Sequence, residues 1–221
     1  MSMAPEITRS CVIRNTNPVS GSANPADIIT GRTLMSALLQ TSAAARYAPA
    51  PGFRYHIELI NGQEIEKPTQ KKLHTWIQVH LIAMLGKLLP EGFEPLSEQD
   101  VLTGERTADG RRGWICPDVQ VAPKKAKYED GMLAEPPLWA VEIMSPGQPL
   151  PQLFTRAERL LAIGCPTVWV IWPEKRRAWE YSAEDLIECQ GKLTGCLPAG
   201  ADSQYVSVDL AEMWKVLDRP E

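Results

Sequence analysis

The stretch from Leu138 to Trp172 constrains the fold more than any other part of the chain. Leu138–Met144 is an almost wholly apolar run, and Thr167–Trp172 is apolar on both faces, as in a central strand. Between them, apolar residues from 150 to 161 recur at helical spacing, and Gly164 provides a good C-terminal cap. A strand, a helix and a second strand in this order predict a right-handed crossover with parallel strands.

The elements around this crossover predict a mixed sheet. Two short strands turn at Asn61–Gly62, a strong hairpin signal. The clearest helix spans Leu73–Leu89, where apolar residues recur every three or four positions. The remaining predicted elements are the hairpin strands Tyr55–Ile60 and Glu64–Lys67, strands Glu94–Leu102 and Trp114–Ala122, a hairpin partner at Arg177–Tyr181, a strand at Tyr205–Val208 and a short helix capped by Asp209. We therefore expect an α/β fold whose mixed central sheet is flanked by helices.

Composition separates the chain into two parts. Residues 1 to about 30 are rich in Ser, Asn, Pro and Thr, and we expect residues 1–50 to form a poorly ordered or loosely attached segment with a short helix at 33–45. Residues 51–221 are expected to form one domain, for which a hydrophobic content of 44% provides an ample core. The chain contains no apolar run long enough for a membrane span, and its five cysteines are scattered without a CxxC pair. A cytoplasmic protein without membrane contact is expected.

Two acidic residues lie in otherwise apolar strands. Asp118 lies within WICPDVQVA and Glu142 within LWAVEIM. A buried carboxylate is costly unless it is paired or binds a metal. If the strands are neighbours, the two carboxylates can converge, and such hard oxygen ligands suit Mg²⁺ or Mn²⁺. The alternative is that Asp118 caps a turn after Pro117 and Glu142 pairs with an arginine.

The order of these features resembles the Uma-two family, a bacterial branch of the PD-(D/E)XK nucleases. The matching stretches are IELINGQEIEKP, the histidine in Leu73–His74, SEQDV, CPDVQVA, AVEIMSPG and AIGCPTVWVIWPEKRRAWEY. The resemblance runs from Tyr55 to Tyr181 and implies a restriction-endonuclease-like core. It also implies that Asp118, Glu142 and Glu58 bind a metal ion. The alternative for Glu58 is an exposed hairpin residue.

The chain departs from the broad nuclease signature at Met144. The signature places a lysine there, two residues after the glutamate. Related sequences carry a basic residue one helix later, and Arg156 has that spacing. A guanidinium at this position can stabilise charge on a phosphate, but it stays charged and cannot act as a base. The alternative is a surface arginine, and for His74 a capping or surface role is expected.

Three functions remain open at this point. The first is a metal-dependent endonuclease that hydrolyses phosphodiester bonds in DNA, with Asp118, Glu142, Glu58 and Arg156 as catalytic residues. The second is a catalytically weakened nuclease fold that serves as a binding or scaffold module. The third is an unrelated α/β protein whose acids pair internally.

The resemblance allows a homodimer. Because the formal net charge is −4, any DNA contacts must come from local basic groups. These groups are Lys67, Lys71 and Lys72; Arg111 and Arg112; Lys124, Lys125 and Lys127; and Lys175, Arg176 and Arg177.

Overall fold

The structure is a computed structural model that describes residues 57–60, 63–67, 70–106, 110–199 and 202–218. All of these residues belong to one compact unit, Tyr55–Glu221. The N-terminal segment predicted at 1–50, with its short helix, lies outside the described residues. The assignment of 51–221 to one nuclease-like domain stays a prediction.

A mixed six-stranded sheet forms the centre of this unit, in the order β12-β11-β10-β9-β6-β3. Its strands are β3 (Phe93–Ser97), β6 (Val119–Pro123), β9 (Trp139–Ile143), β10 (Thr167–Trp172), β11 (Arg177–Ser182) and β12 (Leu186–Cys189). Strands β9 and β10 are parallel and are connected through helix α3 (Leu150–Ala162), whereas the other neighbours are antiparallel. The predicted crossover and mixed sheet are therefore confirmed.

A second six-stranded sheet has the order β2-β1-β5-β4-β8-β7. Its strands are β1 (Ile57–Ile60), β2 (Gln63–Glu66), β4 (Val101–Arg106), β5 (Arg112–Ile115), β7 (Tyr128–Glu129) and β8 (Met132–Leu133). Strands β1 and β2 pair antiparallel with Ile60 opposite Gln63, which confirms the predicted hairpin. A further antiparallel pair, β13 (Lys192–Ala199) and β14 (Asp202–Asp209), extends the strand predicted near Tyr205.

Two predicted strands are each divided in the structure. The prediction of one strand at 94–102 was wrong: β3 and β4 lie in different sheets, and Glu98 between them has a φ of 49° in the left-handed region. The prediction of one strand at 114–122 was also wrong, because the chain leaves β5 after Ile115 and enters β6 at Val119. Pro117 lies in this break, and proline has no N–H to donate to a sheet. The breaks move the chain from one sheet to the other.

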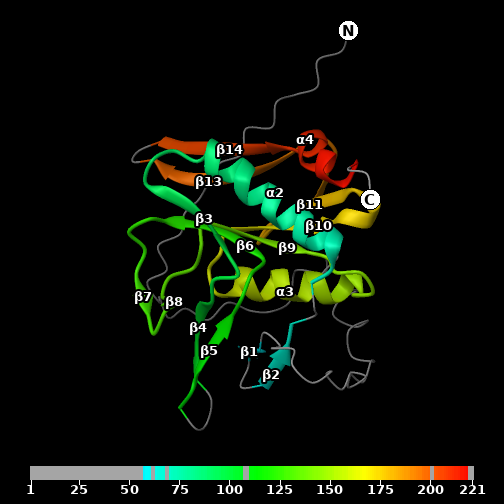
Figure 1. Ribbon diagram of the computed structural model, residues 1–221. Helices are drawn as coiled ribbons and strands as arrows, with labels where there is room; N and C mark the ends of the chain where they lie inside the picture. Colours follow the sequence, from blue (N-terminus) through cyan, green and yellow to red (C-terminus); the bar gives the residue numbers. More distant parts are fainter. Residues whose placement is uncertain (1–56, 61–62, 68–69, 107–109, 200–201, 219–221) are drawn as a thin grey trace, which may run out of the picture. The chain divides into compact units, whose positions relative to one another are not determined.

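The two main helices cover opposite faces of the central sheet (Figure 1). Helix α2 (Lys72–Leu88), which confirms the predicted helix, buries Ile77, Leu81 and Leu85 against one face. Helix α3 packs on the other face through Leu153 and Leu160. The helix predicted after Asp209 is α4 (Leu210–Trp214), and its Glu212 N–H donates to Asp209 Oδ1 at 2.9 Å. Two 3-10 turns complete the elements, η1 (Pro173–Lys175) and η2 (Lys215–Asp218).

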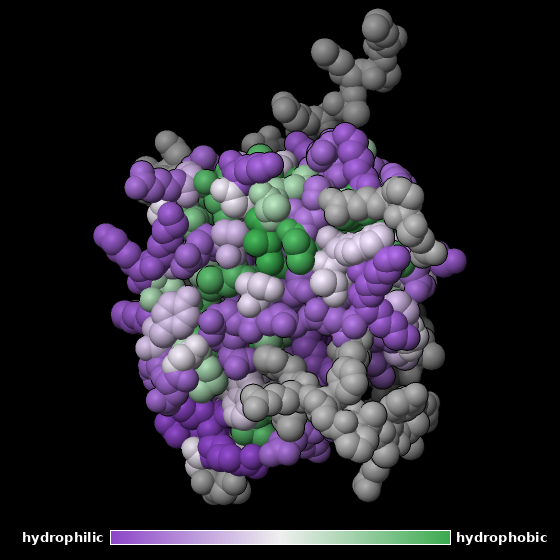
Figure 2. Space-filling view, in the orientation of Figure 1, coloured by the Kyte–Doolittle hydropathy of each residue, from purple (hydrophilic) through white to green (hydrophobic). Residues whose placement is uncertain are grey.

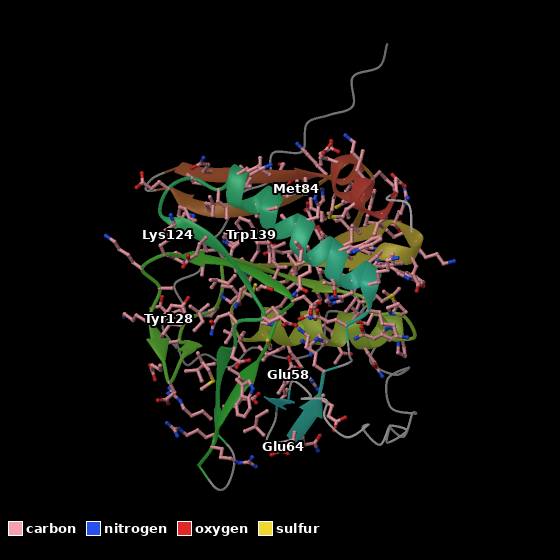
Figure 3. The ribbon with its side chains drawn as sticks, in the orientation of Figure 1. Glu58, Glu64, Met84, Lys124, Tyr128 and Trp139 are labelled. Carbon is pink, nitrogen blue, oxygen red and sulfur yellow. The ribbon has the colours of Figure 1, made fainter. Side chains whose placement is uncertain are left out.

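Side chains of β9 alternate between the two helical layers. Trp139 and Val141 belong to the core on the α2 side, whereas Ala140 and Met144 belong to the core on the α3 side. Figure 3 shows Trp139 between the sheet and α2. Because alternate residues of a strand share a face, Glu142 projects toward α3. The carboxylate of Glu142 therefore lies in the interior between the sheet and α3.

The outer face of α2 is partly apolar. Val79 is 62% exposed and Leu88 is 46% exposed. Figure 2 shows hydrophobic side chains gathered over this helix and surrounded by polar ones. None of the helices in the described ranges combines the length and the apolar character needed to span a membrane.

Candidate functional site

Asp118, immediately before β6, and Glu142, on the neighbouring strand β9, lie close together. Strands β6 and β9 pair antiparallel with Val119 opposite Val141, so the next position along the register places Asp118 opposite Glu142. The N–H of Ile143 donates to Oδ2 of Asp118 at 2.6 Å, which holds the carboxylate against β9. Each acid is only 1% exposed. The two predicted site residues are thus brought together on the same side of the sheet.

Arg156 joins Glu142 to a third acid, Glu58. The guanidinium of Arg156, on α3, donates from Nε to Oε2 of Glu142 at 2.7 Å and from Nη2 to Oε1 of Glu58 at 2.8 Å. Its Nη1 also donates to Oε2 of Glu58. Glu58 is fully buried on β1, and Figure 3 shows it beside α3 on the side of the β1–β2 hairpin. The alternatives of an exposed Glu58 and a surface Arg156 were therefore wrong, whereas the pairing of Glu142 with an arginine is confirmed.

Lys67, which follows β2, pairs with Asp118. Its Nζ lies 2.5 Å from Oδ1 of Asp118, and Lys67 is 7% exposed. The sequence placed Lys67 among the basic groups available for DNA contacts, whereas the structure buries it against Asp118. A signal for its burial exists in the hairpin register: Glu58 is opposite Ile65, so alternation puts Lys67 on the same face as Glu58.

His74 is the second basic partner of Asp118. It lies in the first turn of α2 with its Nε2 3.0 Å from Oδ2 of Asp118, and it is 1% exposed. The capping or surface role expected for His74 was wrong, because the helix turns this residue toward the sheet. Gln78, one turn further, donates to the main-chain carbonyl of Asp118 at 2.9 Å. Helix α2 therefore fixes both the backbone and the side chain of Asp118.

The peptide groups of Cys116 connect the two halves of this network. The N–H of Cys116 donates to Oε1 of Glu58 at 2.8 Å. Its carbonyl accepts from Nζ of Lys67 at 3.0 Å and from Nη2 of Arg156 at 3.0 Å. We call Glu58, Lys67, His74, Asp118, Glu142 and Arg156, with the Cys116 peptide groups, the buried charge network.

The electrostatics of the buried charge network differ between its two central acids. Burial raises the pKa of Glu142 to about 7, because the effect of burial and of Asp118 exceeds that of Arg156. Burial also opposes ionisation of Asp118, but Lys67 and His74 outweigh it and hold the pKa of this acid well below its usual range. Burial lowers the pKa of Lys67, but Asp118 and Glu142 raise it by more than burial lowers it. The pKa therefore lies above its usual value, and the ammonium keeps its charge. The pKa of Arg156 is raised in the same way by Glu142 and Glu58, against burial.

The network fits a divalent cation only in part. Restriction-endonuclease-like proteins generally use divalent metals, and the carboxylates supply the hard oxygen donors that such ions prefer. Oδ1 of Asp118 is a buried oxygen whose neighbour is the ammonium of Lys67, at 2.5 Å. However, no group of three or more acidic, His or Cys side chains within the described ranges is arranged to hold an ion. Arg156 and Lys67 take up the space and charge that an ion would require.

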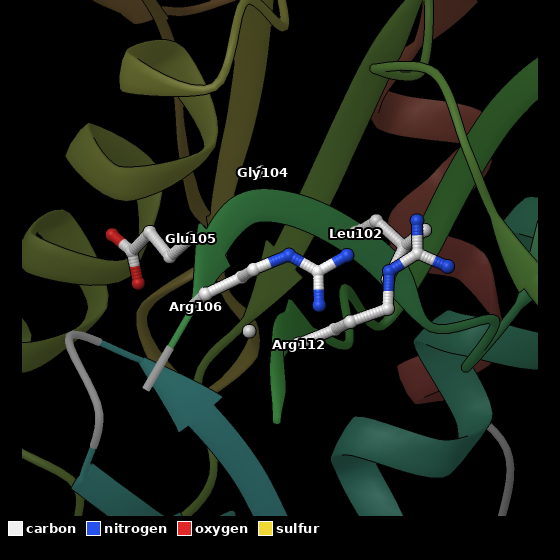
Figure 4. A pocket seen from close by; sticks show the side chains of 6 residues that line it. Leu102, Gly104, Glu105, Arg106 and Arg112 are labelled. Carbon is white, nitrogen blue, oxygen red and sulfur yellow. The ribbon is translucent and has the colours of Figure 1, made fainter. Parts of the chain in front are cut away.

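A shallow pocket lies away from this network, on the hairpin of β4 and β5. Figure 4 shows Arg106 and Arg112 extending along it. Arg112 is bound by Glu129, with Asp130 at 3.6 Å, and Arg106 donates to the carbonyl of Gly110 at 3.1 Å. Acids and main-chain groups therefore already bind both guanidinium groups, and the remaining charged residue that lines the pocket is Glu105.

The parallel crossover, the mixed sheet and the acids at adjacent strands are those of a restriction-endonuclease-like fold. A family model described as "Uma2: Putative restriction endonuclease" matches residues 45–203, and the chain belongs to this family. The structure is similar to a crystal structure from Anabaena variabilis ATCC 29413, titled as a "putative nuclease belonging to DUF820". That similarity has a TM-score of 0.58 at 19% identity and covers 76% of this chain and 94% of the other. A comparison with curated proteins gave no match.

Proposed function

We propose that the protein is a metal-dependent DNA endonuclease that hydrolyses phosphodiester bonds at the buried charge network. The observation that carries this proposal is the convergence of Glu58, Asp118 and Glu142, from three separate segments, within one network. Buried ion pairs are costly, and apolar side chains of similar volume often give equal or greater stability. A network of this kind is therefore better suited to chemistry than to folding alone.

The residues have distinct roles in this proposal. Asp118 and Glu142, supported by Glu58, would hold Mg²⁺ or Mn²⁺, which supplies Lewis acidity and an activated water. Arg156 orients Glu58 and Glu142 through its planar fork and stabilises negative charge on the phosphate. Arg156 cannot take up a proton, because its pKa is raised even further above the usual range.

A second candidate function is a binding or scaffold module that keeps the nuclease fold. Two observations favour it. Met144 occupies the strand position at which the broad signature has lysine, and it packs in the apolar core beside α3. Arg156 already forms ion pairs with two of the three acids. The two functions differ in whether the protein hydrolyses phosphodiester bonds.

Cleavage of supercoiled plasmid DNA distinguishes the two functions. The protein is incubated with plasmid in Mg²⁺ or Mn²⁺, and nicked and linear products are measured by gel electrophoresis. We expect nicking that requires the metal and disappears in Asp118→Asn and Glu142→Gln. Metal-dependent nicking that persists in both variants would show a contaminating nuclease, and no nicking by the folded wild-type protein favours the scaffold.

DNA is the proposed substrate, and its contacts must come from exposed basic groups outside the network. Lys124 and Lys125 are exposed between β6 and β7, and Arg106 lines the pocket on β4 and β5. Phosphate contacts of this kind predict strong salt dependence of DNA binding. The homodimer and the cytoplasmic location stay predictions.

A further inference from the structure

The two oxygens of the Asp118 carboxylate have different surroundings. Oδ2 accepts from the Ile143 N–H at 2.6 Å and faces Nε2 of His74 at 3.0 Å. Oδ1 lies 2.5 Å from the ammonium of Lys67, which is its partner among the described residues. A metal ion that binds Asp118 therefore has to approach Oδ1, on the side that Lys67 occupies.

We propose that the Lys67 ammonium occupies the place of the divalent cation at Asp118, so that a metal ion binds there by displacing it. This inference rests on the proposed function, because it concerns the same metal site. It adds a residue that sets the metal affinity, which neither the family signature nor the carboxylate spacing assigns.

Lys67 is better placed to leave than the other cation of the network. Arg156 is held through all three guanidinium nitrogens by Glu58, Glu142 and the Cys116 carbonyl. Among the described residues, the Lys67 ammonium contacts Oδ1 of Asp118 and the same carbonyl, through one rotatable group on a flexible stem. It also follows the last residue of β2, so its movement does not require any sheet pairing to break.

Charge balance supports the exchange. With the three acids ionised, the network carries one more negative charge than Lys67 and Arg156 compensate. Removal of the ammonium leaves an excess of two negative charges, which matches a divalent ion. With the ammonium in place, an incoming ion meets a site that is largely neutralised, so a low metal affinity is expected for the wild-type protein.

Metal binding by a Lys67→Met variant tests the proposal. Met has a similar length but no charge, and it leaves Asp118 buried without its counter-ion. Mn²⁺ affinity is measured by isothermal titration calorimetry, and the melting temperature is measured with and without Mn²⁺. We expect Lys67→Met to bind Mn²⁺ about tenfold more tightly than the wild type or better, and to gain more in melting temperature from the metal.

Three control variants separate displacement from a general charge effect. Lys71→Met removes the same charge from an exposed position four residues away and should keep the wild-type affinity. Lys67→Arg retains a cation and should not bind Mn²⁺ more tightly than wild type. Lys67→Met combined with Asp118→Asn removes both charges and should lose the tight binding. Equal or weaker Mn²⁺ binding by Lys67→Met, or equal tightening by Lys71→Met, would overturn the proposal.

If Lys67→Met does not fold, chemical labelling of the wild-type protein tests whether Mn²⁺ displaces Lys67. Acetylation of lysines, followed by mass spectrometry, is compared with and without Mn²⁺. We expect Lys67 to be protected without the metal and modified with it, while Lys71 reacts equally in both. Unchanged protection of Lys67 contradicts displacement.

Plasmid cleavage by the same wild-type protein separates the two proposals. Metal-dependent cleavage with no effect at Lys67 would refute the displacement and leave the nuclease function intact. Tight Mn²⁺ binding by Lys67→Met without cleavage by the wild type would refute the nuclease function and leave the displacement intact.

Discussion

Replacement of Arg156 by methionine is expected to be the most destabilising single change in the buried charge network. The guanidinium forms five hydrogen bonds, four to the carboxylates of Glu58 and Glu142 and one to the Cys116 carbonyl. Removing one partner of a buried ion pair costs about 3–5 kcal/mol, because the remaining charge is left without compensation. The upper part of this range is expected here, since two acids lose their partner.

Urea denaturation, followed by circular dichroism, measures this loss. The expected decrease is a large part of the ~5–15 kcal/mol by which domains of this size are stable. Arg159→Met is the matched control, because Arg159 is half-buried on the same helix and makes none of the hydrogen bonds that define the network, although Arg156 and Glu58 affect its pKa. We expect the control to lose less than about 1 kcal/mol.

A further variant identifies the cause of the loss. Glu142→Gln combined with Arg156→Met removes one of the two uncompensated acids, so it should be more stable than Arg156→Met alone. A loss below about 1 kcal/mol for Arg156→Met would refute the reasoning, since the two acids would then not depend on the arginine. So would an additive loss in the double variant.

Three further predictions concern other parts of the fold. In Gly195→Ala, the new Cβ would lie 2.6 Å from ring atoms of the fully buried Trp139, so a loss of about 1–3 kcal/mol is expected by urea denaturation. Burial raises the pKa of the Cys165 thiol from 9.0 to about 12, so the native thiol should resist iodoacetamide at pH 9 and react in urea, as read by mass spectrometry. Because the unfolded thiol ionises first, this group's contribution to stability is present below pH 9 and is lost as the pH rises toward about 12. Asp209→Ala should lower the free energy of unfolding by about 1 kcal/mol, because it removes the cap of α4. Asp209→Asn should keep most of the stability that the cap provides. Equal alkylation of native and unfolded Cys165 would contradict these expectations, as would unchanged stability of Gly195→Ala or Asp209→Ala.

The sequence predicted the elements whose signals are local. The hairpin pairing of the strands that flank Asn61–Gly62 and the apolar period of α2 depend on neighbouring residues, and both are confirmed. The parallel pairing of β9 with β10 follows from the order of strand, helix and strand along the chain. The left-handed backbone at Glu98 has no such signal, because nothing near it marks the chain as leaving one sheet for another.

The sequence was sufficient to identify the acidic residues of the site. Asp118 and Glu142 are conspicuous because charged residues are rare in apolar strands, and the structure places them together. Their basic partners depend on packing between distant elements. Lys67 and His74 reach Asp118 from β2 and from α2, and no spacing along the chain specifies that meeting. The Lys67 ammonium and the His74 ring beside Asp118 are therefore what the structure adds to the sequence.

A crystal of the wild-type protein soaked in Mn²⁺ tests the central claim most directly. We expect an anomalous peak within about 2–2.5 Å of Oδ1 of Asp118 and of a carboxylate oxygen of Glu142, with Nζ of Lys67 moved away. An Asp118→Asn crystal treated in the same way should show no peak. A wild-type crystal in which Lys67 still contacts Asp118 and no manganese lies between the two acids would contradict the account.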